Sequence, residues 1–411
     1  MWSAFVLWFV VAGNNSNAVP AHLLAVMTAD KRKSALIIND TGRRSASAIV
    51  RALQYQTLFE RCASWRAEYT SRHSEALARI LWPRSHRSIP LRVLVRALRL
   101  PLRAYQPLWE RRREEEILER AADFDIVSVI KLRETKLYRR LCTLRRPRII
   151  VDINDAVWLP RFGWHDLPAI LGEVHGVICE NDYVAEYARQ FNSCVIVVPD
   201  APQIEVFDKF RNEVQRDPQQ IVLGWIGEAE TIGHLYRILE PLESLFARHP
   251  QLHLRVVGLG GGGRLPNFEN VGWSCRPFYN QEEMVREVLG FDIGLFPLFH
   301  NEDARGRGTL KAKVYMSGQV AVVCEDYGGN PALVKDGING LLASSPQQWY
   351  EQLERLIVDP DLRAVIARRG METVRANFTA ERVFGQLLGA FEKVCDSAVS
   401  DHALATRSVV A

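Results

Sequence analysis

Short apolar runs alternate with helix-patterned segments along most of the chain. In the first half the runs span residues 35–38, 126–130, 149–153, 176–179 and 194–198. In the second half they span residues 221–226, 252–257, 293–296, 320–324 and 338–343. Short runs that are mostly apolar are typical of strands buried on both faces of a parallel sheet. The alternation predicts an α/β protein with two Rossmann-like domains facing a cleft.

The restart of this pattern divides the chain into parts. Residues 28–203 are predicted to form the first domain, and residues 221–379 the second. The polar segment 204–220 between them is predicted to be a linker without regular structure. A helix over residues 380–396 is expected to pack back towards the first domain, and residues 397–411 are expected to form a disordered tail.

The start of the chain needs a separate interpretation. Residues 2–12 are apolar but too few to cross a bilayer, which takes roughly 20 residues. Met27 is followed by a basic stretch and then by the first apolar run, as at a natural protein start. We interpret residues 1–27 as a dispensable extension, and a membrane anchor is the alternative.

Composition narrows the functional classes. The 411 residues are 47% hydrophobic and 24% charged, with a formal net charge of only +4. These values are typical of a globular protein, and we expect no nucleic-acid partner. The seven cysteines lie far apart without a Cys-x-x-Cys pair, which argues against a disulfide framework or a zinc site. This usage favours a reducing compartment, so we expect a cytoplasmic protein.

Basic residues gather in two segments of the first half. Arg92, Arg96, Arg99 and Arg103 recur at helical spacing, and residues 131–148 carry eight Lys or Arg against one Glu. Such faces suit an anionic membrane surface or a charged acceptor. They predict peripheral association with the inner face of a membrane, and an ordinary solvated helix face is the alternative.

Two motifs suggest other chemistry but lack the context that this chemistry needs. Glycines at 258 and 260–263 follow a strand, but Pro266 argues against the helix that a dinucleotide site requires. We therefore expect no NAD and no other cofactor. Asp123 and Asp125, and likewise Asp152 and Asp155, resemble metal-binding pairs at strand ends. Convergent ligands of the kind a catalytic metal needs are not visible, so no metal site is predicted.

The most informative stretch surrounds a predicted helix start at Thr309. Its basic residues are Arg305, Arg307, Lys311 and Lys313. A helix N-terminus attracts anions and repels cations, and Gly306 and Gly308 would let backbone N–H groups approach a ligand. We predict a site for an anion such as a diphosphate. A solvated loop whose cations pair with Glu302 and Asp303 is the alternative.

The order of several motifs resembles the group 1 glycosyltransferases, which have the GT-B fold. In the second half these motifs are Gly224-Trp-Ile-Gly227, residues 291–298, Arg305-Gly-Arg-Gly-Thr-Leu-Lys311 and residues 336–342. In the first half they are residues 47–55, 152–156 and 181–188. The similarity covers the chain from about residue 34 to about residue 394.

The resemblance implies transfer of a sugar from a nucleotide-diphosphate sugar to a glycan or lipid-linked acceptor, with retained anomeric configuration and without a metal. The second domain would bind the donor through Gly227, Thr231, Arg305, Arg307, Lys311 and Asn330. The first domain would bind the acceptor through Ser47, Arg51, Asp155 and Asn181. The nucleotide sugar would be a co-substrate, and no catalytic residue is assigned.

Several positions depart from the family. Two glutamates that the family often carries eight positions apart are here Gly306 and Val314. A serine-rich turn is replaced by Glu228 and Glu230, which would repel a diphosphate or pair with the two arginines ahead of the helix. The alternative function is therefore a catalytically silent GT-B protein that binds a nucleotide or a partner.

Overall fold

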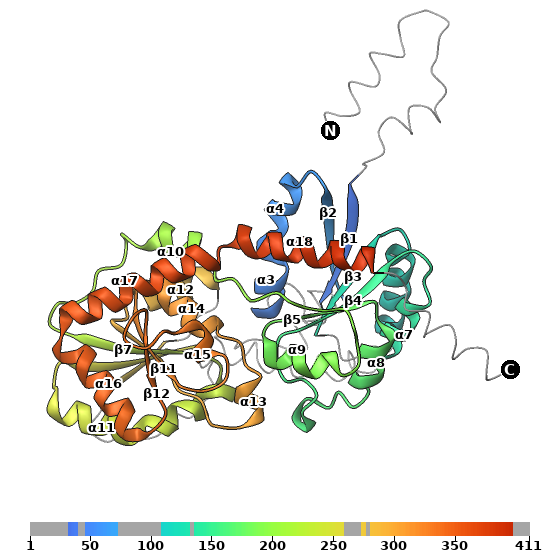
Figure 1. The fold of residues 1–411 in the computed structure, drawn as a ribbon. Coiled ribbons are helices and arrows are strands. Elements are labelled where there is room, and N and C mark those ends of the chain that lie inside the picture. The colour runs from blue at the N-terminus through green and yellow to red at the C-terminus, as the bar shows by residue number, and fades with distance from the viewer. Residues whose placement is uncertain are drawn as a thin grey trace, which may run out of the picture.

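The chain folds into two lobes, each built around one parallel sheet (Figure 1). The computed structural model describes residues 32–39, 46–72, 108–131, 135–258, 273–276 and 280–397. The extension at 1–27, the arginine face at 92–103, the glycines at 260–263 and most of the tail lie outside this range. The predicted α/β class with two Rossmann-like domains is confirmed.

The first lobe contains six strands in the order β2-β1-β3-β4-β5-β6, and all pairs are parallel. They are β1 (Lys33–Asn39), β2 (Trp65–Ser71), β3 (Ile126–Ile130), β4 (Arg148–Ile153), β5 (Gly176–Cys179) and β6 (Val195–Val197). The pattern missed β2, because most positions of this edge strand are partly exposed and polar. The helices are α3 (Ala46–Arg51), α4 (Gln56–Arg61), a helix at 108–121, α7 (Thr135–Cys142), α8 (Leu167–Glu173) and α9 (Asp182–Arg189).

The second lobe contains six parallel strands in the order β12-β11-β10-β7-β8-β9. They are β7 (Ile221–Ile226), β8 (Leu252–Val257), β9 (Trp273–Arg276), β10 (Ile293–Phe296), β11 (Ala321–Glu325) and β12 (Leu341–Ala343). The helices that follow β7 and later strands are α11 (Leu239–Arg248), α12 (Gln281–Leu289), α13 (Glu302–Arg305), α14 (Leu310–Ser317), α15 (Asn330–Leu333), α16 (Pro346–Val358) and α17 (Pro360–Asn377).

Apolar side chains cover both faces of each sheet. In the first lobe, α7 and α8 pack on one face through residues such as Leu137 and Leu171. In the second lobe, α11 and α16 cover one face, and α12 and α14 cover the other. Burial on both sides explains why the inner strands β3, β5, β7 and β10 read as mostly apolar runs in the sequence.

Helix α18 (Ala380–Asp396) continues from α17 and lies along the first lobe (Figure 1). The ring of Phe391 lies 5.4 Å from that of Trp65. The ring of Phe384 lies 4.7 Å from that of Phe59, edge to face. These aromatic contacts make α18 part of the first lobe's core and tie the two lobes together.

Two segments differ from the predicted pattern. Helix α10 (Ile204–Phe210) lies inside the segment expected to be irregular, and Phe207 and Phe210 join the core of the second lobe. The predicted helix over 232–248 is instead a 3-10 segment, η3 (Ala229–Ile238), followed by α11. Pro241 lies in the first turn of α11, where a missing N–H costs no helical hydrogen bond.

Candidate functional site

The strand order places the predicted site residues beside one another. Ligands of doubly wound sheets bind at the carboxyl ends of the strands, where the strand order reverses. In the second sheet this reversal lies between β7 and β10. The segment after β7 contains Gly227 and Thr231, and the segment after β10 leads through α13 to Arg307 and α14.

Lys311 is a cation of this region that contacts aromatic rings and, among the described residues, no acid. Its Nζ lies 4.4 Å from the centre of the Trp225 ring, and it has no ion pair with any described residue. Burial, followed by the charge of Arg307, lowers the pKa of Lys311 to about 7. The Nε1–H group of Trp225 is buried and also has no acceptor within the described ranges. A cation over an aromatic face, next to an unused donor, is a favourable place for an anion.

The two arginines ahead of α14 are held in different ways. Arg307 donates to Asp303 Oδ2 at 2.9 Å, as expected for the solvated-loop alternative. The Arg305 guanidinium instead lies 4.6 Å from the centre of the Tyr183 ring in the first lobe. Neither arginine pairs with Glu228 or Glu230 in the described part of the chain, so the expectation of that pairing is wrong.

The two glycines that follow these arginines serve the contact between the lobes. A Cβ atom on Gly306 would lie 2.5 Å from the Cβ of Ala156. A Cβ atom on Gly308 would lie 2.6 Å from the carboxyl carbon of Glu180. Both neighbours belong to the first lobe. The expectation that these glycines make room for a ligand is therefore corrected: the packed first lobe requires their small size.

The remaining predicted donor residues shape loops. Gly227 N–H donates to Val257 O at 3.0 Å, and the Thr231 hydroxyl donates to Glu228 O at 3.0 Å. Thr309 occupies the N-cap position of α14 but makes no side-chain cap hydrogen bond. Asn330 is buried, and its Nδ2 donates to the backbone oxygen of Glu325 at 3.0 Å, so it anchors the loop after β11.

Two of the predicted acceptor residues are committed to the protein itself. Arg51 is 5% exposed, and its guanidinium donates to Asp152, Asp200 and the backbone oxygen of Val198. The prediction of Arg51 as an acceptor-binding residue is corrected, since these bonds use most of its donors. Asn181 caps α9, and its Nδ2 donates to the Gly306 oxygen at 3.2 Å across the lobes.

The positions of Asp155 and Ser47 suit the prediction that they bind an acceptor better than that of Arg51 does. In the first sheet the strand order reverses between β1 and β3. Lys131 follows β3 with a positive φ of 49°, and it forms an ion pair with Asp155, which follows β4. Ser47 lies half-buried in α3. Lys131 and Asp155 therefore mark the place in the first lobe where a doubly wound sheet binds ligands.

The aspartates of the possible metal pairs have other partners. Asp125 accepts from Ser34 and pairs with Arg146, while Asp152 pairs with Arg51. Across the described ranges, no group of three or more His, Cys, Asp or Glu side chains could hold a metal ion.

The described residues include no helix both long and apolar enough to cross a membrane.

Sequence reasoning missed four residues that the fold brings to this region: Lys131, Glu180, Tyr183 and Trp225. Lys131 and Glu180 directly follow a buried strand, Tyr183 lies in the first turn of α9, and Trp225 lies near the end of β7. Their position at carboxyl ends of strands was a usable signal. Nothing in the sequence indicated which residue of the other lobe each of them contacts.

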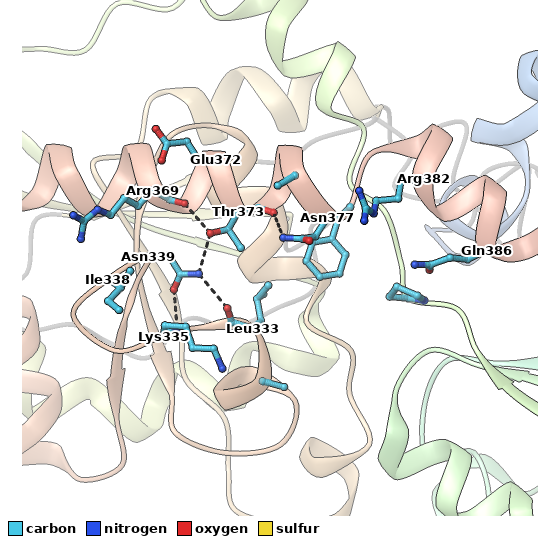
Figure 2. A pocket seen from close by; sticks show the side chains of 14 residues that line it. Leu333, Lys335, Ile338, Asn339, Arg369, Glu372, Thr373, Asn377, Arg382 and Gln386 are labelled. Atoms are coloured by element: carbon cyan, nitrogen blue, oxygen red, sulfur yellow. Dashed lines mark hydrogen bonds between the residues drawn. The ribbon is translucent and has the colours of Figure 1, made fainter.

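A separate pocket of about 860 Å³ lies beside the connection between α17 and α18 (Figure 2). None of the predicted site residues lines it. Figure 2 shows Asn339 between Leu333 and Thr373, and its Nδ2 donates to both, at 3.2 and 3.1 Å. These bonds hold the 335–339 turn against α17.

Comparison with known proteins finds similarity to glycosyltransferases. A family model described as "Glycosyl transferase-like" matches residues 236–389. D-inositol 3-phosphate glycosyltransferase of Corynebacterium jeikeium is 29% identical over 195 residues, which are 42% of this chain and 45% of the relative. The corresponding protein of Actinosynnema mirum is 26% identical over 243 residues, 52% of this chain and 54% of the relative. The chain thus spans about half the length of these curated relatives.

Solved structures show the same fold. Sucrose-phosphate synthase from Thermosynechococcus elongatus matches with a TM-score of 0.61 at 14% identity, over 88% of this chain and 99% of that protein. Anabaena HepE in complex with UDP-glucose matches with a TM-score of 0.57 at 14% identity, over 87% of this chain and 99% of that protein. At such identities the similarity establishes the two-lobed fold alone.

Proposed function

We propose that the chain is a divergent member of the group 1 glycosyltransferase family and that it transfers a sugar from a nucleotide-sugar donor to an acceptor. The donor's diphosphate lies at the start of α14, between the segments that follow β7 and β10. The acceptor lies against the first lobe, near Lys131 and Asp155.

The uncompensated charge of Lys311 carries this proposal. Lys311 lies in the first turn of α14, where the helix dipole disfavours a cation, and Arg307 adds a second positive charge nearby. A bound diphosphate compensates both. The same groups stabilise the negative charge that develops on the nucleoside diphosphate as the sugar leaves, which is electrostatic catalysis by preorganised groups.

Calorimetric titration with UDP, other nucleoside diphosphates and UMP tests donor binding. We expect one nucleoside diphosphate to bind and its monophosphate to bind much more weakly, because the second phosphate contacts the cations. UDP-glucose is a suitable first sugar nucleotide, since it is bound in the HepE structure. Absence of binding by every nucleoside diphosphate would contradict the donor site.

For the acceptor, we propose a glycan or a lipid-linked glycan. Aromatic side chains along one side of α9 support this choice: Trp158 stacks on Tyr187 at 4.0 Å, and Tyr183 and Phe191 continue the cluster. Aromatic rings with polar edges suit sugar rings. We further propose no metal requirement, because fixed cations take the place of a metal, and retention of the anomeric configuration, which the family resemblance implies. NMR of the product's anomeric proton and an assay in EDTA test these two points.

A peripheral attachment to an anionic membrane is a further part of the proposal. Arg139, Arg140 and Arg146 are exposed and lie close to Glu173, Glu115 and Asp125 respectively, which reduces their net charge. The attachment therefore rests mainly on the arginine face at 92–103, outside the described residues. Flotation with anionic and neutral liposomes at low salt tests it, and equal recovery with both would contradict it.

A second candidate is a silent nucleotide-binding or partner-binding protein. The substituted glutamate positions favour it: Gly306 packs on Ala156, and Val314 is 6% exposed within the core of the second lobe. Neither position offers a carboxylate to a donor sugar. Nucleotide binding without hydrolysis or transfer of any tested sugar nucleotide would favour this function over the enzyme.

A further inference from the structure

Five ionisable side chains form a buried cluster where the lobes meet. The first lobe and the segment after it provide Arg51, Asp152, Glu180 and Asp200, and α14 of the second lobe provides Lys313. All five are at most 5% exposed. Charges at such depth are stable only when they are paired and hydrogen-bonded.

One cation of the cluster faces two carboxylates. Arg51 lies 2.9 Å from Asp152 and 3.0 Å from Asp200, and its Nη1 also donates to the Val198 oxygen at 2.6 Å. Burial raises the pKa of the neighbouring Tyr55 and raises that of Cys179 to about 12, so both stay neutral. Within the first lobe alone, these charges sum to minus one before Glu180 is counted.

Lys313 enters this cluster from the second lobe. Its Nζ donates to the Asp200 backbone oxygen at 2.9 Å and lies 3.8 Å from Glu180 Oε1. The other carboxyl oxygen of Glu180 accepts from Asn181 at 2.8 Å. Lys313 is therefore the only cation that the second lobe adds among the described residues of the cluster.

The charges do not balance unless one carboxyl group is protonated. Three carboxyl groups face two cations, so the fully ionised cluster has a net charge of minus one. Burial raises the pKa of Glu180 from 4.5 to about 7, and the charge of Asp200 adds to the effect. Burial also lowers the pKa of Lys313 and raises that of Asp152. Asp152 accepts three hydrogen bonds from the Arg51 guanidinium, which favour its ionised form, whereas Glu180 accepts from the neutral amide of Asn181. A neutral Glu180 beside a charged Lys313 then gives the cluster zero net charge.

Glu180 also contacts the loop that carries the proposed donor site. Its carboxyl carbon would lie 2.6 Å from a Cβ on Gly308, so the loop packs directly on the carboxyl group. Asn181, which donates to Glu180, also donates to the Gly306 oxygen at 3.2 Å. The protonation state of Glu180 therefore acts on the segment between Arg305 and Lys311.

We propose that Glu180 is a positioning residue that takes up a proton as the lobes pack together, and so couples pH to the placement of the 305–309 loop. Packing of the lobes is favoured where Glu180 is neutral in the packed state. As pH rises from about 4.5 to about 7, the equilibrium constant for packing of the lobes falls by up to about tenfold per pH unit. Above pH 7 it falls no further through Glu180. Only the consequence for donor binding rests on the proposed function.

Small-angle X-ray scattering of the full chain without nucleotide tests the coupling. The radius of gyration is measured from about pH 5.5 to about pH 8 for the parent, for Glu180→Gln and for Glu186→Gln. Glu186 is an exposed glutamate of α9 and serves as the matched control. We expect the parent and Glu186→Gln to expand as pH rises, and Glu180→Gln to stay compact.

The opposite result is equally clear. A parent that does not expand, or a Glu180→Gln variant with the parent's pH profile, would overturn the inference. If Glu180→Gln does not fold, Glu180→Ala takes its place, since the smaller side chain also removes the titrating group beside Gly308.

UDP-glucose calorimetry separates this inference from the proposed function. Its diphosphate does not titrate in this pH range, so the parent's affinity should fall between about pH 6 and about pH 7 by up to about tenfold, and Glu180→Gln should show no such fall. Absence of UDP-glucose binding at every pH would count against this donor, while the scattering result would still decide the role of Glu180.

Discussion

The ammonium group of Lys311 lies 4.4 Å from the centre of the Trp225 ring and 5.2 Å from that of Phe296, without an acidic partner among the described residues. Both rings belong to the second sheet, one on β7 and one on β10. Lys311 therefore lies where the strand order reverses and has no anion among the described side chains to compensate its charge. The first two predictions rest on this geometry.

Replacement of Lys311 by Met should weaken binding of a nucleoside diphosphate ten- to a hundredfold. The substitution keeps an apolar chain over Trp225 and removes a charge-assisted contact worth about 1.5–3 kcal/mol. Calorimetry with UDP measures the effect. Lys335→Met, at an exposed lysine of the same lobe, is the control and should bind as the parent does.

Nucleotide binding should take up a proton above neutral pH. The pKa of Lys311 is lowered to about 7, and a bound diphosphate raises it again by compensating the charge. Affinity for UDP-glucose should therefore lose up to about tenfold per pH unit above pH 7 through Lys311. Calorimetry at about pH 8 in two buffers of different ionisation enthalpy counts the protons. If the Lys311→Met variant still takes up a proton on binding the nucleotide, a group other than Lys311 binds that proton.

Replacement of Glu228 by Ser should tighten nucleotide binding several-fold. Glu228 is exposed at the N-cap position of η3, directly after β7, where its charge repels a diphosphate. Serine also suits an N-cap position. Titration with UDP compares this variant with Glu243→Ser on α11, which should bind as the parent does. Unchanged affinity in Glu228→Ser would place the diphosphate away from the β7 loop.

Replacement of Gly308 by Ala should destabilise the contact between the lobes. The new methyl group would lie 2.6 Å from the Glu180 carboxyl carbon, an overpacking that costs about 1–3 kcal/mol. Denaturant unfolding measures the cost. Gly385→Ala is the control, because this helical glycine of α18 has open space around it and should gain about 0.5–1 kcal/mol.

Replacement of Phe391 by Ala should remove much of the anchoring of α18 on the first lobe. Phe391 is fully buried against Trp65 and Phe59, so the loss should be about 3–5 kcal/mol in the free energy of unfolding. Phe191→Ala, at a ring that is 37% exposed and packs on Tyr187, should cost clearly less than Phe391→Ala. A similar loss in both variants would show that α18 docking does not depend on this ring.

The sequence by itself determined the architecture. A strand buried on both faces is mostly apolar along its length, so β3, β5, β7 and β10 could be located residue by residue. It also located the basic stretch at the start of α14, because a helix N-terminus disfavours cations whatever surrounds it. The edge strand β2 escaped, since its partly exposed positions carry no continuous apolar signal.

Only the tertiary structure decided which charges meet. Glu180 and Lys313 are 133 positions apart, and Arg51 and Asp200 are 149 apart, yet each pair lies within 4 Å. The resemblance to the family predicted that Arg51 binds an acceptor, but burial beside two carboxylates commits it to the core. Burial and partners set the free energy of a charge, and a linear pattern contains neither.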